Sequence, residues 1–106
     1  MANGVLGKAA PLTDTNTSVY QVPVDTFSVV SINICNRGAT STLVNIGICA
    51  GTTPNTDEFI EFETEILANG VLERTGIVVG AEQYVIVRCS TGDTTAMVYG
   101  IETPTA

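Results

Sequence analysis

The sequence predicts an all-β protein, an antiparallel β-sandwich of about seven strands with immunoglobulin-like or jelly-roll-like connections. Apolar and small polar residues alternate through most of the 106 residues, which is the pattern of strands with one buried face. Clusters of glycine, asparagine, threonine and proline interrupt this alternation at short intervals and mark turns. A chain of this length corresponds to one domain, and it lacks the tryptophan typical of a true immunoglobulin domain.

Seven segments are predicted as strands because each alternates in polarity and ends at a turn signal. They comprise residues 18–22, 26–35, 42–49, 57–66, 71–79, 83–89 and 95–101. The turn at 36–41 contains asparagine and glycine, so the second and third strands are expected to form a hairpin. Residues 18–106 are thus predicted to form a single sandwich domain.

Residues 1–17 are predicted to be an N-terminal arm. The segment contains early glycines, a proline and a tract of threonine, asparagine and aspartate, and Val5 and Leu6 are its one adjacent pair of bulky apolar residues. Two interpretations stay open for this arm. It is either a frayed terminus or a segment that becomes ordered against a neighbouring subunit through Val5 and Leu6.

The chain carries few charges and a clear excess of acids. Only 14% of its residues are charged, against about 25% in a typical globular domain. Eleven acids and four bases give a net charge of −7, which disfavours binding to nucleic acid or to an anionic membrane. So small a number of charges requires a surface of uncharged polar residues, or one covered by partners.

The three cysteines, Cys35, Cys49 and Cys89, are expected to be reduced. Their odd number and the absence of CxxC spacing argue against a disulfide framework or a zinc site. Immunoglobulin-like strand order would allow Cys35 and Cys89 to face each other across the core.

The first ten residues lack the features of a signal peptide, and no segment approaches the roughly 20 apolar residues of a membrane span. Synthesis in the cytoplasm is therefore expected.

The sequence predicts neither an enzyme nor a cofactor site. It contains no histidine, the commonest general base and metal ligand, and no Walker loop or GxSxG motif. Paired carboxylates could serve glycoside hydrolysis, but the chain offers few aromatic residues to form a sugar platform.

Concentrated charge occurs in the predicted strand at 57–66. Its five acids are Asp57, Glu58, Glu61, Glu63 and Glu65. Alternation divides the strand between two faces, with Ile60, Phe62, Thr64 and Ile66 on one and Phe59, Glu61, Glu63 and Glu65 on the other. Glutamates two residues apart in a strand are spaced by roughly 7 Å, which is too far to bind one ion well. This spacing favours a solvated strand face, or an edge strand whose charges prevent aggregation. Contact with another protein and Ca²⁺ binding are the alternatives.

The arginines are candidates for contacts with a partner because the chain has so few bases. Arg88 lies within an apolar strand, where a charge is costly unless it is paired. An ion pair between subunits, formed with the acid-rich strand, and an ordinary exposed arginine both remain open. The predicted interface residues are Val5, Leu6, Arg37, Arg74, Arg88, Glu61, Glu63 and Glu65.

Three stretches of the chain resemble small virion proteins of tailed bacteriophages, notably those of cyanobacteria and other aquatic hosts. They are MANGVLGKAAP, VYQVPVDTFSVVSINICNRG, and ANGVLERTGIVV leading to YVIVRCSTGDTTAMVYGIE. This resemblance covers nearly the whole chain. It implies a single β-sandwich that serves as a structural part of the particle and brings no catalytic residues with it.

The resemblance implies a capsid decoration (cement) protein, located in the virion, that self-associates as a dimer or trimer and binds the major capsid protein. The alternative that it implies is a tail, neck or fibre component. Such a component would bind a host receptor or glycan through its loop tips at 36–41, 51–56 and 90–93. Those loops carry no tryptophan or tyrosine to stack on a sugar.

Overall fold

The computed structural model describes residues 3–105 and contains, within them, eight strands and one 3₁₀ helix. The strands are β1 (Asn3–Ala9), β2 (Thr17–Gln21), β3 (Thr26–Asn36), β4 (Thr42–Cys49), β5 (Phe59–Ile66), β6 (Val71–Val79), β7 (Tyr84–Cys89) and β8 (Thr94–Pro104). The helix η1 (Thr56–Glu58) precedes β5. Each of the seven predicted strand segments contains a strand, although the one predicted at 57–66 starts at Phe59, because residues 57 and 58 belong to η1. In the described part of the chain, no helix is long and apolar enough to cross a membrane.

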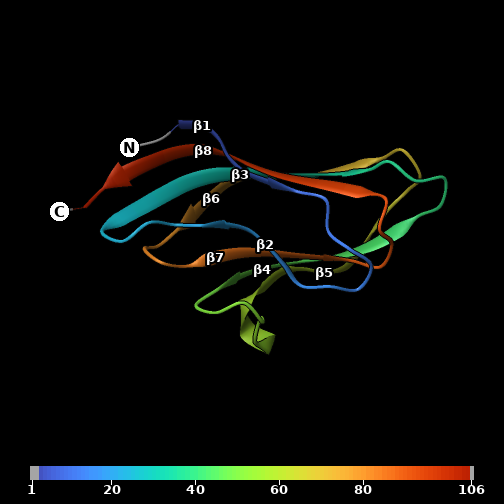
Figure 1. The fold of residues 1–106 in the computed structure, drawn as a ribbon, viewed down its shortest axis with the longest axis horizontal. Helices are drawn as coiled ribbons and strands as arrows, with labels where there is room; N and C mark the ends of the chain where they lie inside the picture. Colours follow the sequence, from blue (N-terminus) through green and yellow to red (C-terminus); the bar gives the residue numbers. More distant parts are fainter. Residues whose placement is uncertain (1–2, 106) are drawn as a thin grey trace.

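Two four-stranded antiparallel sheets pack face to face (Figure 1). One has the strand order β1-β8-β3-β6 and the other the order β2-β7-β4-β5. Because most connections cross from one sheet to the other, strands far apart in sequence become neighbours, as β1 and β8 do. This order is that of the eight-stranded jelly roll. The predicted β-sandwich is therefore confirmed, and jelly-roll connections describe it.

The predicted hairpin between the second and third strands is wrong. β3 pairs with β6 and β8, whereas β4 lies in the opposite sheet and pairs with β5 and β7. The turn at 36–41 thus connects the two sheets. Its asparagine and glycine specify a reversal of direction but not the partner, and β3 finds its partner in β8, with which it is in register from Thr26 to Asn36.

The predicted N-terminal arm also differs from the structure. Residues Asn3–Ala9 form β1, an edge strand that pairs along β8 of the same chain. A register shift between Val5 and Gly7 turns Leu6 inward, where it packs partly against the core, while Val5 stays 58% exposed. Residues 1 and 2 of the predicted arm, and residue 106, lie outside the described residues.

The core lies between the sheets and consists mainly of β-branched side chains. Alternation in β3 buries Val30, Ile32 and Ile34, and these side chains share one core cluster with Val44 and Ile46 of β4. Full burial of such a side chain contributes roughly 1.5–3 kcal/mol, so this cluster is the main source of stability.

The three cysteines are free. Cys89 is fully buried in the core cluster, whereas Cys35 follows the inward-facing Ile34 and lies on the outer side of β3. The two cysteines therefore do not face each other across the core. The jelly-roll order, in place of the immunoglobulin-like order, is compatible with this separation.

Candidate functional site

Two β-bulges in β5 shape the outer face of the β2-β7-β4-β5 sheet. The Cα pairs between the strands are Gly47 with Phe59, Ile46 with Glu61, and Val44 with Thr64. In each step β5 advances one residue further than β4, so it contains two extra residues. The alternation expected for this strand is therefore not maintained.

The bulges bring Phe59 and Phe62 together on the outer face. Their ring centroids are 5.1 Å apart and the rings meet edge to face, with Phe62 62% exposed. The prediction that Phe62 shares the face of Ile60 is therefore wrong. The second bulge is held by Asn45 of β4, whose Oδ1 accepts a 2.6 Å hydrogen bond from the backbone N–H of Glu63. Glu63 adopts a positive φ of 49° at this point.

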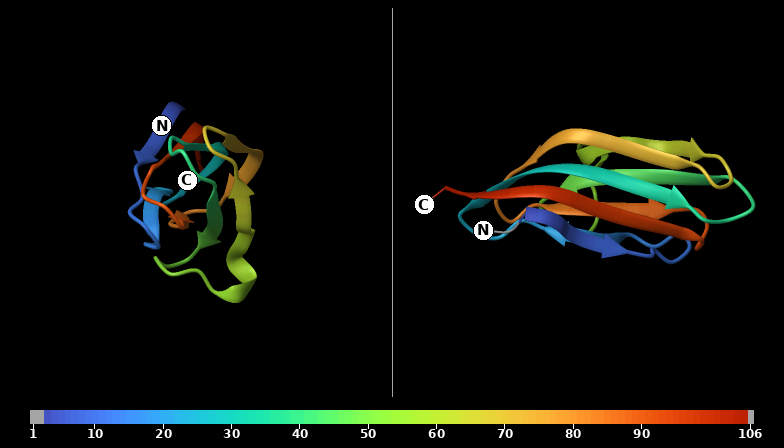
Figure 2. Two further views of the ribbon diagram at one scale, coloured as in Figure 1. Left: turned by 90° about the vertical axis from the view of Figure 1, so that its right-hand side faces the viewer. Right: turned by 90° about the horizontal axis from the view of Figure 1, so that it is seen from above.

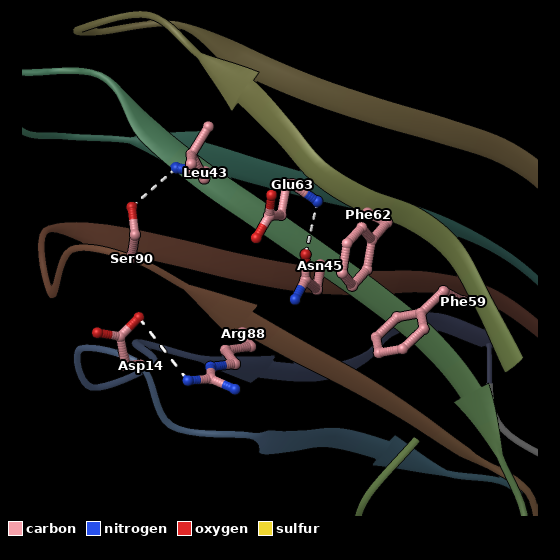
Figure 3. A pocket seen from close by; sticks show the side chains of 8 residues that line it. All are labelled: Asp14, Leu43, Asn45, Phe59, Phe62, Glu63, Arg88 and Ser90. Atoms are coloured by element: carbon pink, nitrogen blue, oxygen red, sulfur yellow. Dashed lines mark hydrogen bonds and ion pairs between the residues drawn. The ribbon is translucent and has the colours of Figure 1, made fainter. Parts of the chain in front are cut away.

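A cavity of about 270 Å³ adjoins the two phenylalanines (Figure 3). Its lining comes from three strands and two loops and comprises Leu43, Asn45, Phe59, Phe62, Glu63, Arg88, Asp14 and Ser90. A second cavity, of about 600 Å³, is lined by Pro54, Thr56 and the same two phenylalanines. We call the two cavities together the Phe59–Phe62 groove.

One wall of the groove comes from the second half of the predicted N-terminal arm. The backbone N–H of Asp14 donates a 2.8 Å hydrogen bond to the carbonyl of Cys89, and Thr13 forms a β-bridge with the same residue. This attachment places Asp14 Oδ1 4.0 Å from Arg88 Nη2 (Figure 3). Both side chains are well exposed, so this ion pair contributes little stability and leaves both groups accessible.

The opposite wall depends on a glycine. The loop between β4 and β5 folds back over β4, and a Cβ at position 47 would lie only 2.8 Å from Pro54 Cγ. Gly47 therefore permits the close approach of this loop.

Cys49 on β4 is fully buried. Its burial, with a smaller contribution from the Glu58 carboxylate, raises the pKa of the Cys49 thiol to about 11.

The predicted acidic cluster is dispersed. Glu61 forms an ion pair with Arg74 and accepts a 2.6 Å hydrogen bond from Thr64 Oγ1. Glu63 and Glu65 are exposed, so the three glutamates do not share a face. Glu58 accepts hydrogen bonds from the backbone N–H groups of Asn55 and Ala50, at 2.8 and 3.3 Å. Within residues 3–105, no three potential metal-ligating side chains come together.

The ion pair of Arg74 and Glu61 connects the edges of the two sheets, because Arg74 lies on β6 and Glu61 on β5. Arg74 Nη1 also donates a 3.1 Å hydrogen bond to the carbonyl of Ile60. The hydrogen bond from Thr64, with Arg74 as a further cause, holds the pKa of Glu61 below its usual value against the opposing effect of burial. Arg74 therefore has an acidic partner within its own chain.

Arg37 lies where the chain crosses between the sheets. Its Nε donates to Thr95 Oγ1 at 2.9 Å and its Nη2 donates to the carbonyl of Thr94 at 3.3 Å. Its backbone N–H donates to the carbonyl of Asp93 at 2.7 Å. Arg37 thus connects the loop between β3 and β4 to the start of β8. Of the three candidate arginines, Arg88 is the one that lines the groove.

The outer face of the β1-β8-β3-β6 sheet is a second candidate surface (Figure 2, right). In one row across the sheet, Ile101 pairs with Val29 and Asn3, and Val29 pairs with Val78. We call this surface the uncharged face and define it by Val5, Val29, Val78, Met97, Tyr99 and Ile101. Its exposed members include Val78 at 66%, Val5 at 58% and Ile101 at 51%.

Charges are scarce around the uncharged face. Lys8 lies opposite Met97 in the register, and Glu73 lies opposite Asn33. Glu73 accepts a hydrogen bond from the Tyr99 hydroxyl. Arg37 reaches the end of the same face through its hydrogen bond to Thr95. The face thus carries two bases and one acid, so it does not share the acidic excess of the chain as a whole, which has a net charge of −7.

No protein-family model matches this chain, and a search of curated proteins finds no matching sequence. The two surfaces and the fold are the structural observations that bear on its function.

Proposed function

We propose that this chain is a structural protein of a tailed-bacteriophage particle, a capsid decoration protein that self-associates and binds the major capsid shell. The resemblance of three stretches to phage virion proteins supports this role. The jelly roll is compatible with it, since viral capsid proteins and lectins both use this fold. The fold alone does not define a function, so the proposal depends on a surface suited to assembly.

The uncharged face is the observation that carries the proposal. Of the eleven acids in the chain, Glu73 is the one that projects from this sheet face, and its carboxylate already accepts a hydrogen bond from Tyr99. Two acidic copies, or one copy and a shell protein, can therefore meet here with little repulsion between like charges. Val5, Val78 and Ile101 supply apolar area that a partner would remove from water.

The dimensions of the face suit a protein contact. The molecule measures 46 × 27 × 19 Å, and its two sheets extend along the longest of these dimensions (Figure 1). A standard interface buries about 800 Å² on each partner, which is comparable with one face of such a sheet. On a particle each contact repeats many times, so modest affinity per copy is sufficient.

Substitution on the uncharged face tests the proposal. The double variant V78E/I101E puts two carboxylates into the face, and L67E puts one at an equally exposed apolar position on the β5–β6 turn. Sedimentation velocity and binding to purified phage heads are measured for all three proteins. We expect the unmodified and L67E proteins to form oligomers and bind heads, and the double variant to be monomeric and unbound. The proposal would be contradicted if the unmodified protein were monomeric and did not bind phage heads.

A second candidate function is that of a tail, neck or fibre component that binds a host glycan. One observation favours it, the Phe59–Phe62 groove. Two of the three loop tips expected from the sequence contribute to its lining, through Pro54 and Thr56 of 51–56 and Ser90 of 90–93. The loop at 36–41 does not, and Asn36 at its start is fully buried. Labelling of the tail instead of the head in electron micrographs would select this candidate.

A further inference from the structure

We infer that the Phe59–Phe62 groove is a carbohydrate site that accepts a neutral hexose unit of an oligosaccharide. The inference goes beyond the decoration role and does not depend on it, and it specifies the ligand class of the glycan-binding candidate. The groove lies on the outer side of the β2-β7-β4-β5 sheet, whereas the proposed assembly contact uses the other sheet.

The first argument is the pairing of an apolar platform with polar groups. A hexose ring has apolar C–H faces and a rim of hydroxyl groups. Phe59 and Phe62 offer an exposed aromatic surface, to which an apolar face can pack. Asn45, Arg88 and Asp14 stand beside it with an amide, a guanidinium and a carboxylate. These planar groups can each bind two hydroxyls at once.

The second argument is that the Asn45 amide and the backbones beneath the other polar groups are held in place. Asn45 Oδ1 is engaged by the backbone N–H of Glu63, which fixes the amide and leaves its NH₂ group on the side of Arg88 (Figure 3). Arg88 projects from β7, a strand paired on both sides. Asp14 is held by the hydrogen bond of its backbone to Cys89. The Asn45 amide and the backbones that carry Arg88 and Asp14 are thus in place before a ligand binds, which reduces the entropy lost on binding.

The third argument concerns charge. The groove holds one base, Arg88, and two acids, Asp14 and Glu63. Its net charge is therefore −1, which disfavours phosphates, sulfated sugars and nucleic acids. A neutral sugar carries no such penalty.

The fourth argument concerns peptides. A peptide commonly binds a β-protein by adding a strand to a free sheet edge. The strand beneath the groove, β4, is paired with β5 on one side and with β7 on the other, so its backbone groups are already in a ladder. The strand β5 is an edge strand, but its two bulges interrupt the regular ladder that an added peptide strand would need. The groove therefore offers side chains for recognition, which suits a sugar better than an extended peptide.

The size of the groove indicates the length of the ligand. Small-molecule sites usually measure about 300–1,000 Å³. The polar cavity of about 270 Å³ lies just below that range and suits one ring. The adjoining cavity of about 600 Å³ lies beyond the two phenylalanines and can take the next unit. We therefore expect a disaccharide or longer chain to bind more tightly than a monosaccharide.

The test uses a panel of neutral oligosaccharides built from glucose, galactose, mannose and N-acetylglucosamine. Each is titrated into isotopically labelled full-length protein and followed by amide chemical shifts. At least one member is expected to cause saturable shifts centred on Asn45, Phe62 and Arg88. F62A is expected to weaken that binding about tenfold. L67A, which truncates an equally exposed apolar residue outside the groove, should leave it unchanged.

Three outcomes would overturn the inference. One is that no member of the panel binds, and another is that F62A and L67A bind equally well. The third is that the groove amides shift with protein concentration in the absence of sugar, which would show that another protein molecule occupies the groove. A failure here leaves the behaviour of V78E/I101E unaffected, so it is distinguishable from a failure of the decoration role.

Discussion

The Tyr20 hydroxyl on β2 donates a 2.5 Å hydrogen bond to Glu102 Oε2 on β8 and so connects the two sheets through the core. Ser28 of β3 lies 2.7 Å from the same hydroxyl. Tyr20 is 8% exposed, Glu102 9% and Ser28 0%. Three strands from both sheets thus meet at one buried polar group, which fixes how the sheets are placed on each other.

Replacement of Tyr20 by phenylalanine tests this connection. Y20F keeps the ring in the core but removes the hydroxyl, which leaves the buried Glu102 and Ser28 without that partner. We expect the free energy of unfolding to fall by about 1–3 kcal/mol in urea titrations. Y84F, which removes the hydroxyl of a less buried tyrosine, serves as the control. Equal stability of Y20F and Y84F would contradict the assigned role.

From the burial of the Tyr20 hydroxyl we also predict that the protein loses stability at alkaline pH. Burial, with the hydrogen bond to Glu102 as a further cause, raises the pKa of Tyr20 to about 12, against about 10 in an unfolded chain. The unfolded state therefore releases this proton first, and the free energy of unfolding falls between about pH 10 and 12. The slope from this group is at most about 1.4 kcal/mol per pH unit. Denaturant titrations across this range should show a shallower decline for Y20F than for the unmodified protein.

The ion pair between Glu61 and Arg74 predicts the opposite dependence on pH. The pKa of Glu61 is lowered in the folded state, so its contribution is present above its usual pKa and is lost as the pH falls. We expect E61Q to be less stable than the unmodified protein by about 1 kcal/mol at pH 7, with Arg74 partly exposed. The difference should shrink in acid. E65Q, which replaces an exposed glutamate of the same strand, is the matched control. It should leave the free energy of unfolding unchanged both at pH 7 and in acid.

We predict that substitution of Asn36, at the connection from β3 to β4, strongly destabilises the protein. Its fully buried Nδ2 donates to the carbonyls of Thr40, Ile66 and Leu67, at 2.8, 3.1 and 3.2 Å. N36D would place a carboxylate against these carbonyl oxygens. We expect destabilisation of at least about 3 kcal/mol, measured by thermal and urea unfolding. N16D adds the same charge at an exposed position and should unfold like the unmodified protein.

Local patterns predicted the strands well, because alternation within one strand is a property of neighbouring residues. In β3, for example, Ile32 and Ile34 face inward as the pattern indicates. The pattern failed for β1, where Gly4 and Gly7 interrupt it and where pairing depends on β8, at the other end of the chain. It failed again for the connection after β3, since turn residues do not identify the partner strand.

The groove could not be predicted from alternation. It exists because two bulges shift β5 against β4, and one of them is held by a contact between Asn45 and the backbone of Glu63. Its walls come from segments far apart in sequence, such as Asp14 and Arg88. One local signal was present, since Phe59 and Phe62 are three residues apart in a strand otherwise rich in acids. That spacing departs from a period of two and is compatible with a bulge.

Immunogold labelling of intact phage particles with an antibody to this chain tests the proposed role most directly. We predict label spread evenly over the heads, as expected for a decoration protein present in many copies. Label confined to the tail or neck would contradict the decoration role and favour the tail or fibre alternative. Particles without label would contradict any role in the virion.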